Sequence, residues 1–152
     1  MQTENNQSET KFETSFQTGI KILNTSSKLL LTLNKLLKQH RLTFQQYYVL
    51  RIIRYTANIV SIKDISSKML DSNSNTSRLI DKLMEKGLVI RKISDTDKRI
   101  VNIYLNKKGI DLAEVVRITL TSEFETRIDE FSTEEVTIFN AILDRINKVI
   151  IH

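Results

Sequence analysis

A run of small polar residues ends in an arginine near the middle of the chain. It reads Asp71-Ser72-Asn73-Ser74-Asn75-Thr76-Ser77-Arg78. Hydroxyl and amide side chains can hydrogen-bond to phosphates or base edges, and an arginine can reach a guanine or a phosphate. If a helix begins here, these side chains fill its first turn, the end that would enter a major groove about 12 Å wide. The alternative is that they only cap the helix, because Ser72 is a good N-cap in any protein.

A second charged group, Asp97-Lys98-Arg99, separates two apolar stretches. An arginine on a narrow hairpin can enter a minor groove, whose negative potential attracts it, and Asp97 can hold the guanidinium in place. The alternative is a solvated turn with an exposed ion pair of little energetic value. A helix-turn-helix before the hairpin favours the first interpretation. The candidate DNA-contacting residues are Ser72, Asn73, Ser74, Asn75, Thr76, Ser77, Arg78, Lys82, Asp97, Lys98 and Arg99.

The basic residues are concentrated in one part of the chain. The net charge is +5, but residues 15–108 carry 18 Lys or Arg against six Asp or Glu, a net charge of +12. Residues 1–14 carry −2 and residues 109–152 carry −5. This distribution is typical of a surface for a polyanion, and nucleic acid is the commonest such partner. A merely solvated basic surface is the alternative.

Composition limits the fold and the class of function. The chain has 152 residues, about one domain, with no Pro, three Gly and no Cys, so we expect a mainly helical protein without disulfides or thiolate metal sites. The first fourteen residues are polar, and no run approaches the roughly 18 apolar residues of a membrane span, so we expect a soluble cytoplasmic protein. His40 and His152 are the only histidines, and we expect neither a metal site nor a cofactor.

Hydrophobic periodicity predicts the elements that position these residues. A long amphipathic helix carries Phe16, Ile20, Leu23, Leu30 and Leu37 and ends near His40. Two further helices begin with capping boxes, at Thr43 with Gln46 and at Ser61 with Asp64. After a break at residues 70–72, a helix over residues 73–86 keeps Leu79, Ile80 and Leu83 on one face and stops at Gly87, a C′ glycine. These last two helices form a helix-turn-helix.

A β-hairpin and two helices complete the predicted order. The strands are Leu88 to Ile93 and Ile100 to Leu105, with a turn over residues 94–98. Asn106 can cap the next helix, and Ser132 with Glu135 forms a third capping box. The final helix places Val136, Phe139, Leu143, Ile146 and Ile150 in a heptad-like seam that needs a facing helix.

The predicted fold class is therefore mainly α with a small β-hairpin wing. It combines a winged helix-turn-helix DNA-binding domain over residues 42–105 with a helical dimerisation region over residues 15–41 and 106–152. Residues 1–14 are expected to form a flexible tail. The terminal helices carry more apolar surface than a small central domain could cover, so we expect them to pair with each other and with a second chain.

Four motifs resemble the MarR family of bacterial transcriptional regulators. They are Leu42-Thr43-x-x-Gln46-x-x-Val49-Leu50, the stretch from Thr76 to Val89 with Glu85-Lys86-Gly87, the turn Asp95-x-Asp97-Lys98-Arg99, and Leu105-Asn106-x-x-Gly109. The resemblance implies a dimer with a winged domain on DNA. It also implies that the second helix lines a cleft for a small-molecule effector, with Tyr47, Tyr48, Arg51 and Tyr55 as candidate contacts. Core packing is the alternative for these aromatic residues. The chain departs from the family at Asn106, where Thr is usual, and at residues 73–75, which lack the usual basic or proline residues.

The expected function is a sequence-specific transcriptional regulator that acts as a homodimer on a pseudo-palindromic operator in double-stranded DNA. We expect a repressor, released by a small-molecule effector. The alternatives are a helical adaptor that binds protein and a small enzyme. The sequence has no Gly-rich phosphate loop, no Ser-His-Asp set and no metal triad, which argues against the enzyme. The basic wing argues against the adaptor.

Overall fold

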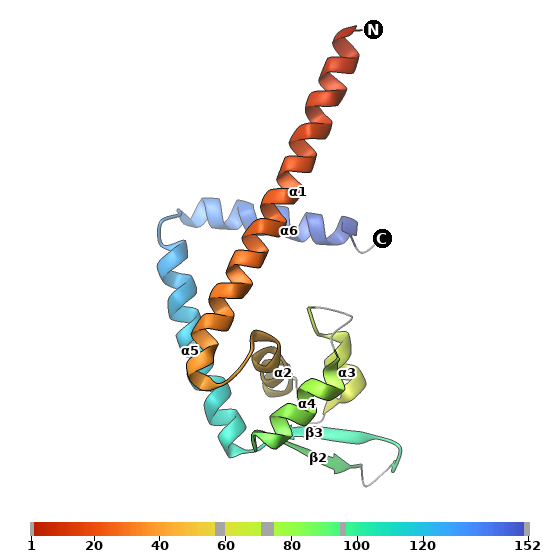
Figure 1. Cartoon of the computed structure of the whole chain (residues 1–152), viewed down its shortest axis with the longest axis vertical. Coiled ribbons are helices and arrows are strands. Elements are labelled where there is room, and N and C mark those ends of the chain that lie inside the picture. The colour runs from red at the N-terminus through yellow and green to blue at the C-terminus, as the bar shows by residue number, and fades with distance from the viewer. Residues whose placement is uncertain (1, 57–59, 71–74, 95–96, 151–152) are drawn as a thin grey trace. The chain divides into compact units, whose positions relative to one another are not determined.

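The computed structural model of the chain describes residues 2–56, 60–70, 75–94 and 97–150. Contacts divide the chain into two compact units, Met1–Ala113 and Glu114–His152 (Figure 1). The first unit contains the helix-turn-helix and the sheet. The second contains most of the helix that follows the sheet and the whole of the last helix.

The first helix is longer than the sequence predicted. Helix α1 spans Gln2–Leu37 and is followed by a short 3₁₀ segment, η1, at Lys38–His40. The prediction of a flexible tail over residues 1–14 therefore differs from the structure, which has helical backbone from Gln2 onward. The physical reason is that no Gly or Pro interrupts this stretch before Gly19, so nothing stops a helix already nucleated downstream.

Helix α2, Phe44–Tyr55, starts with the predicted capping box. The Thr43 hydroxyl accepts a hydrogen bond from the Gln46 backbone N–H, and the Gln46 side chain accepts one from the Thr43 N–H, each at 3.2 Å. These bonds satisfy donors that every helix start leaves unpaired. The inward face of α2 is buried over Val49, Leu50, Ile52 and Ile53.

The helix-turn-helix consists of α3, Ile62–Ser67, and α4, Thr76–Glu85. The Ser61 capping box is present at the start of α3. Ile80 and Leu83 on α4 are completely buried, which fixes which face of that helix turns outward. Gly87 has φ +64°, the left-handed region that favours glycine, so the predicted C′ glycine is confirmed.

The predicted hairpin is confirmed, and a third strand joins it. Strands β2, Val89–Ile93, and β3, Val101–Leu105, pair antiparallel, and we call this hairpin the wing. The sequence did not predict β1, Val60–Ser61. This strand pairs with the edge of β3 opposite β2 and makes β3 the central strand. Val60 lies opposite Ile103, and both side chains are buried. The extra strand ties the start of α3 to the wing.

Helix α5, Lys107–Ile128, begins in the first unit and continues into the second, where α6, Thr133–Ile150, follows. Asn106 caps α5 by accepting a 2.8 Å hydrogen bond from the Gly109 N–H, and Ser132 with Glu135 forms the predicted capping box. Along the predicted seam of α6, Phe139 is 59% exposed. Much of the apolar surface of this helix therefore faces solvent in the single chain.

The first turn of α5 lies so close to the sheet connection that only glycine fits at position 109. A Cβ on Gly109 would lie 2.1 Å from the backbone oxygen of Leu88, whereas a Cβ on Gly19 in α1 would meet nothing within 4 Å. We expect Gly109→Ala to lower the free energy of unfolding by about 1–3 kcal/mol, as overpacking does. Gly19→Ala is the matched control and should stabilise by up to about 1 kcal/mol through helix propensity. Urea unfolding followed by circular dichroism measures both, and equal midpoints for the two variants would contradict the close approach.

Candidate nucleic-acid interface

The start of α4 is held by Asn75, which is the N-cap of the helix. Its side-chain Oδ1 accepts a 3.0 Å hydrogen bond from the Arg78 backbone N–H, and Thr76 is only 4% exposed. The helix therefore begins at Thr76, three residues later than predicted. The Asn75 side chain thus holds the helix start and Thr76 is buried there, and the role of both as DNA contacts stays a prediction. The predicted contacts Ser72, Asn73 and Ser74 lie outside the described residues.

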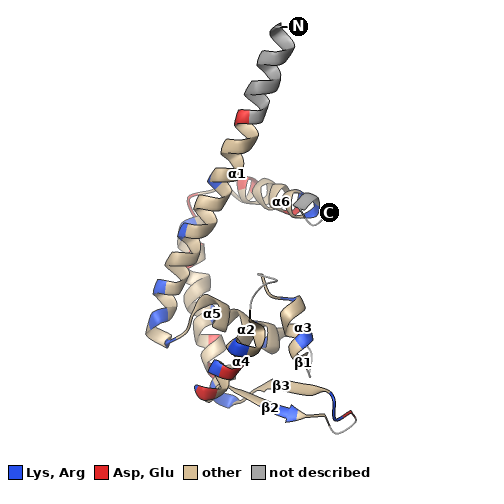
Figure 2. Cartoon of the chain, turned by 45° about the vertical axis from the view of Figure 1, so that its right-hand side comes forward, with Lys and Arg blue, Asp and Glu red and all other residues tan. Residues whose placement is uncertain are grey.

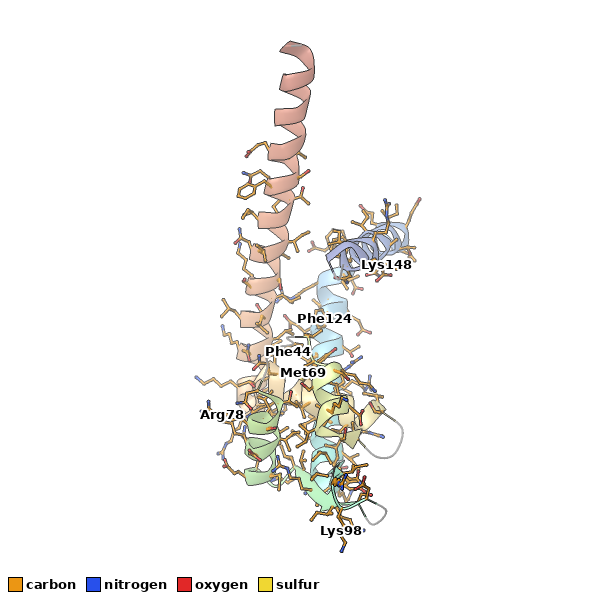
Figure 3. The ribbon with its side chains drawn as sticks, turned by 90° about the vertical axis from the view of Figure 1, so that its right-hand side faces the viewer. Phe44, Met69, Arg78, Lys98, Phe124 and Lys148 are labelled. Atoms are coloured by element: carbon orange, nitrogen blue, oxygen red, sulfur yellow. The ribbon has the colours of Figure 1, made fainter. Side chains whose placement is uncertain are left out.

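The outward face of α4 carries Ser77, Arg78 and Lys82, all exposed. Arg78 and Lys82 are four residues apart and so share one side of the helix, away from buried Ile80 and Leu83. Figure 3 shows Arg78 projecting from α4. These are the predicted α4 contacts that the structure leaves available for a ligand.

One acidic side chain on α4 is tied to the wing. Asp81 Oδ1 lies 2.9 Å from Nη2 of Arg91 on β2. Both side chains are partly exposed, so the pair adds little to stability, but it connects α4 to the hairpin. This pair joins residues ten positions apart and was not predicted from the sequence.

The turn of the wing is shaped by Asp97. Its Oδ1 accepts a 2.9 Å hydrogen bond from the Arg99 backbone N–H, and its carbonyl accepts one from the Ile100 N–H. The expectation that Asp97 holds the guanidinium of Arg99 is wrong, because the described residues include no ion pair between these two side chains. A bond to the nearby backbone orders the turn without immobilising a long side chain. Lys98 and Arg99 are exposed, with Lys98 at the tip (Figure 3).

A surface hollow of about 720 Å³ lies between the start of α3 and the wing, lined in part by Lys63, Asp64 and Arg99. The Asp64 carboxylate accepts hydrogen bonds from the Ser61 hydroxyl at 2.7 Å and the Ser61 N–H at 2.9 Å. These bonds lower the pKa of Asp64, with the side-chain bond contributing most. Asp64 is therefore an ionised structural group, and Lys63 and Arg99 are the cationic groups of the hollow.

Basic residues recur on the wing and α4 (Figure 2). Strand β2 carries Lys92 as well as Arg91, and the turn carries Lys98 and Arg99. Positive charges from two neighbouring elements of one unit can bind successive phosphates of a duplex. This arrangement fits nucleic acid better than a small anion.

The predicted effector residues on α2 divide into two groups. Tyr47 is buried and belongs to the core, as the alternative interpretation held. Tyr48, Arg51 and Tyr55 form a stripe in which the Arg51 guanidinium lies 5.8 Å from the Tyr48 ring centroid and 5.7 Å from that of Tyr55. A cation between two aromatic faces is a recurrent stabilising contact. The stripe offers both stacking surface and positive charge.

Other kinds of site find no support within the described part of the chain. No group of three His, Cys, Asp or Glu side chains there could hold a metal ion. No described helix is long and apolar enough to cross a membrane.

Comparison with known proteins identifies the chain. The model of the MarR family matches residues 42–101, which contain the helix-turn-helix and most of the wing. The HTH-type transcriptional regulator MhqR of Bacillus subtilis is 30% identical over 114 residues, which cover 75% of this chain and 78% of MhqR. The chain belongs to the MarR family. It is a DNA-binding transcriptional regulator of the winged helix-turn-helix type and not an enzyme.

Solved structures of MarR-family proteins show the same fold. A complex of Staphylococcus aureus MepR with DNA matches with a TM-score of 0.79 at 22% identity, covering 86% of this chain and 96% of MepR. CouR from Rhodococcus jostii, bound to p-coumaroyl-CoA, matches with a TM-score of 0.71 at 21% identity, covering 85% of this chain and 90% of CouR. The predicted fold class, mainly α with a winged helix-turn-helix, is thereby confirmed.

Proposed function

We propose that this MarR-family regulator acts as a homodimeric repressor on a pseudo-palindromic operator in double-stranded DNA. In this proposal α4 enters the major groove and the wing follows an adjacent minor groove. The observation that carries it is α4 itself, whose buried side is anchored by Ile80 and Leu83 while Arg78 and Lys82 remain exposed. The likeness to MepR, solved as a complex with DNA, supports the same use of the fold.

The residues divide into contacts and supports. Ser77, Arg78 and Lys82 would contact bases and phosphates from α4, and Lys98 and Arg99 would do so from the wing. Asn75, Thr76 and Asp97 would act indirectly, because their side chains hold the helix start and the turn. Ser72, Asn73 and Ser74 keep their proposed role as contacts on the sequence evidence alone.

Dimerisation is proposed for the terminal helices, residues 15–41 and 106–152, with the DNA-binding domain at residues 42–105. In the single chain, α1 exposes Ile20, Leu23 and Leu30. Helix α6 exposes Ile138, Phe139 and Ile142. Surfaces of this kind are rarely left in contact with water, and a two-fold partner would cover them.

Release by a small-molecule effector is proposed at the α2 stripe of Tyr48, Arg51 and Tyr55. Its two aromatic faces and one cation suit an aromatic acid or another flat anion. CouR, which binds p-coumaroyl-CoA, shows that one protein of this fold accepts an aromatic ligand. We infer that the regulator works in the cytoplasm, where its operator lies.

If the chain is a dimer, dimerisation should depend on the exposed apolar side chains of α6. Sedimentation at micromolar concentration should give about twice the 17.7 kDa of one chain. Phe139→Glu should shift the protein toward the monomer, because it places a charge in an apolar interface. Asn140→Glu adds the same charge to the neighbouring exposed position and should leave the dimer intact. A wild-type protein that sediments only as a monomer would refute the proposal.

Arg78 should contribute to specificity because it lies in the first half of α4, the helix proposed to enter the major groove and called the recognition helix below. Arg78→Ala should weaken binding to a cognate duplex by about 1–3 kcal/mol, and should weaken binding to random DNA less. Lys148→Ala on α6 removes an equal charge outside the proposed DNA interface and is the matched control. Fluorescence anisotropy with both duplexes measures these differences. Equal losses on the two duplexes would show that Arg78 contacts only phosphates.

The wing should sense the width of the minor groove. Arg99→Ala should cost most on operators with A·T-rich flanks, where the groove is narrow and its potential strongest. Asp97→Ala should cause a weaker form of the same loss, up to about 1 kcal/mol, because one hydrogen bond that shapes the turn is lost. Asp97→Asn keeps an Oδ1 acceptor for the Arg99 N–H and should bind like wild type. If the Arg99→Ala variant is folded and dimeric and binds operators with A·T-rich and G·C-rich flanks as wild type does, the wing does not touch DNA.

A further inference from the structure

Lys86, at the C-terminal end of α4, turns its side chain away from the proposed DNA-contacting end. The residue is the C-cap of α4, with its backbone N–H bonded to the Lys82 carbonyl. Its ammonium group donates hydrogen bonds to Oε1 of Gln46, at 2.8 Å, and to the backbone carbonyl of Arg41. These partners lie forty or more residues earlier in the sequence, at the corner where α1 ends and α2 begins.

Gln46 provides a rigid acceptor for this contact. Its side chain is 5% exposed, and the same Oε1 already accepts the Thr43 N–H in the capping box of α2. One amide oxygen therefore joins the start of α2 to the end of α4. The capping box predicted from the sequence is also a tertiary contact.

The Arg41 carbonyl is a second fixed acceptor. Arg41 has φ +54°, a left-handed conformation that costs a residue with a Cβ some energy, and it ends η1 just after the long helix α1. Carbonyls at a helix C-terminus lack partners within the helix and carry partial negative charge, so a cation there is favourable. Burial is the main cause that lowers the pKa of Lys86, and Lys82 adds to it, so the ammonium group depends on these two acceptors.

The other side of the same turn is bonded to α5. The Lys86 carbonyl accepts a hydrogen bond from the Lys108 side chain at 3.2 Å, and the Gly87 carbonyl accepts one from the Asn106 side chain at 2.8 Å. Asn106 in turn caps α5. The end of the recognition helix is thus joined both to the end of α1 and to the start of α5, the two helices that lead into the proposed dimerisation region.

We propose that Lys86 is a positioning residue, whose ammonium group locks the recognition helix to the α1–α2 corner and so sets operator affinity without touching DNA. This proposal rests on the proposed function of α4. It makes the Lys86–Gln46–Arg41 contact the route by which a displacement of α1 changes the angle of α4. An effector or a subunit rotation that moves the corner would then alter DNA binding through this contact.

The experiment compares Lys86→Met with Lys82→Met. Both remove one ammonium group from α4, but Lys82 is exposed on the proposed DNA face. Binding is measured as a function of salt on a duplex selected for wild-type binding from a random library and on a scrambled duplex of the same composition. Lys82→Met should weaken binding to both duplexes and lower the slope of log K against log salt by about 0.9, the value for one phosphate contact. Lys86→Met should leave the slope unchanged and weaken binding to the selected duplex by roughly tenfold, about the effect of losing one base contact.

Conservative variants separate positioning from packing and from loss of folding. Lys86→Arg keeps a charged donor and should recover most of the affinity. If Lys86 acted only by packing its aliphatic stem, Lys86→Met would keep that packing and bind like wild type. If Lys86→Met does not fold, Lys86→Gln, which keeps one donor, should fold and bind the selected duplex more weakly with the wild-type salt slope. A salt slope reduced as in Lys82→Met, or wild-type affinity in a folded Met or Gln variant, would overturn the proposal. A wild-type protein that does not distinguish the two duplexes would instead overturn the proposed function.

Discussion

Burial of Ile80 and Leu83 is the interaction on which the DNA-binding unit depends. Helix α4 has ten residues, and a helix that short is marginal in water without tertiary contacts. Its stability and its orientation therefore depend first on these two completely buried side chains. The periodicity of the helix then decides what faces outward, because residues 78 and 82 lie opposite residues 80 and 83. Hydrophobic packing thus determines which polar side chains are available to a ligand.

Polar groups at the helix ends are used for structure first. Asn75, Asn106 and Asp97 each have the chemistry of a nucleic-acid contact, yet each bonds to a nearby backbone N–H. An unpaired N–H at a helix start or a tight turn costs free energy, and a short side chain can satisfy it with little loss of entropy. Long side chains such as Arg78, Lys82 and Arg99 cannot cap their own helix or turn in this way. Arginine and lysine end in groups that only donate hydrogen bonds, so they cannot accept such an N–H and remain available to a ligand.

The sequence predicted the features that depend on local chemistry. Three capping boxes, the C′ glycine at Gly87 and the hairpin all follow from residues within a few positions of one another. Apart from the N-terminal part of α1, the missed features are contacts between residues far apart in the sequence or positions at which several residues serve equally well. Strand β1 is two residues long, too short for any periodicity, and the Asp81–Arg91 and Gln46–Lys86 contacts require the fold to be known. In the polar run before α4 several residues are equally good caps by type, so the sequence alone does not single out Asn75, which is the N-cap in the structure.

Few side chains on one recognition helix remain to read bases. Among the described residues of α4, the predicted contacts still available are Ser77, Arg78 and Lys82, and a lysine acts mainly as a point charge for phosphate. One helix of this kind discriminates weakly between sequences, since each good base contact contributes only about 1–3 kcal/mol. In the proposed dimer, specificity comes largely from presenting two such helices at the spacing of two half-sites, and from the shape of the minor groove at the wing. Residues far from DNA then matter for binding, because a small rotation of α4 about its C-terminal end produces a larger displacement at its N-terminal end. Under this proposal, a displacement of the helices that hold α4 would switch the regulator without any change in the residues proposed to contact the operator.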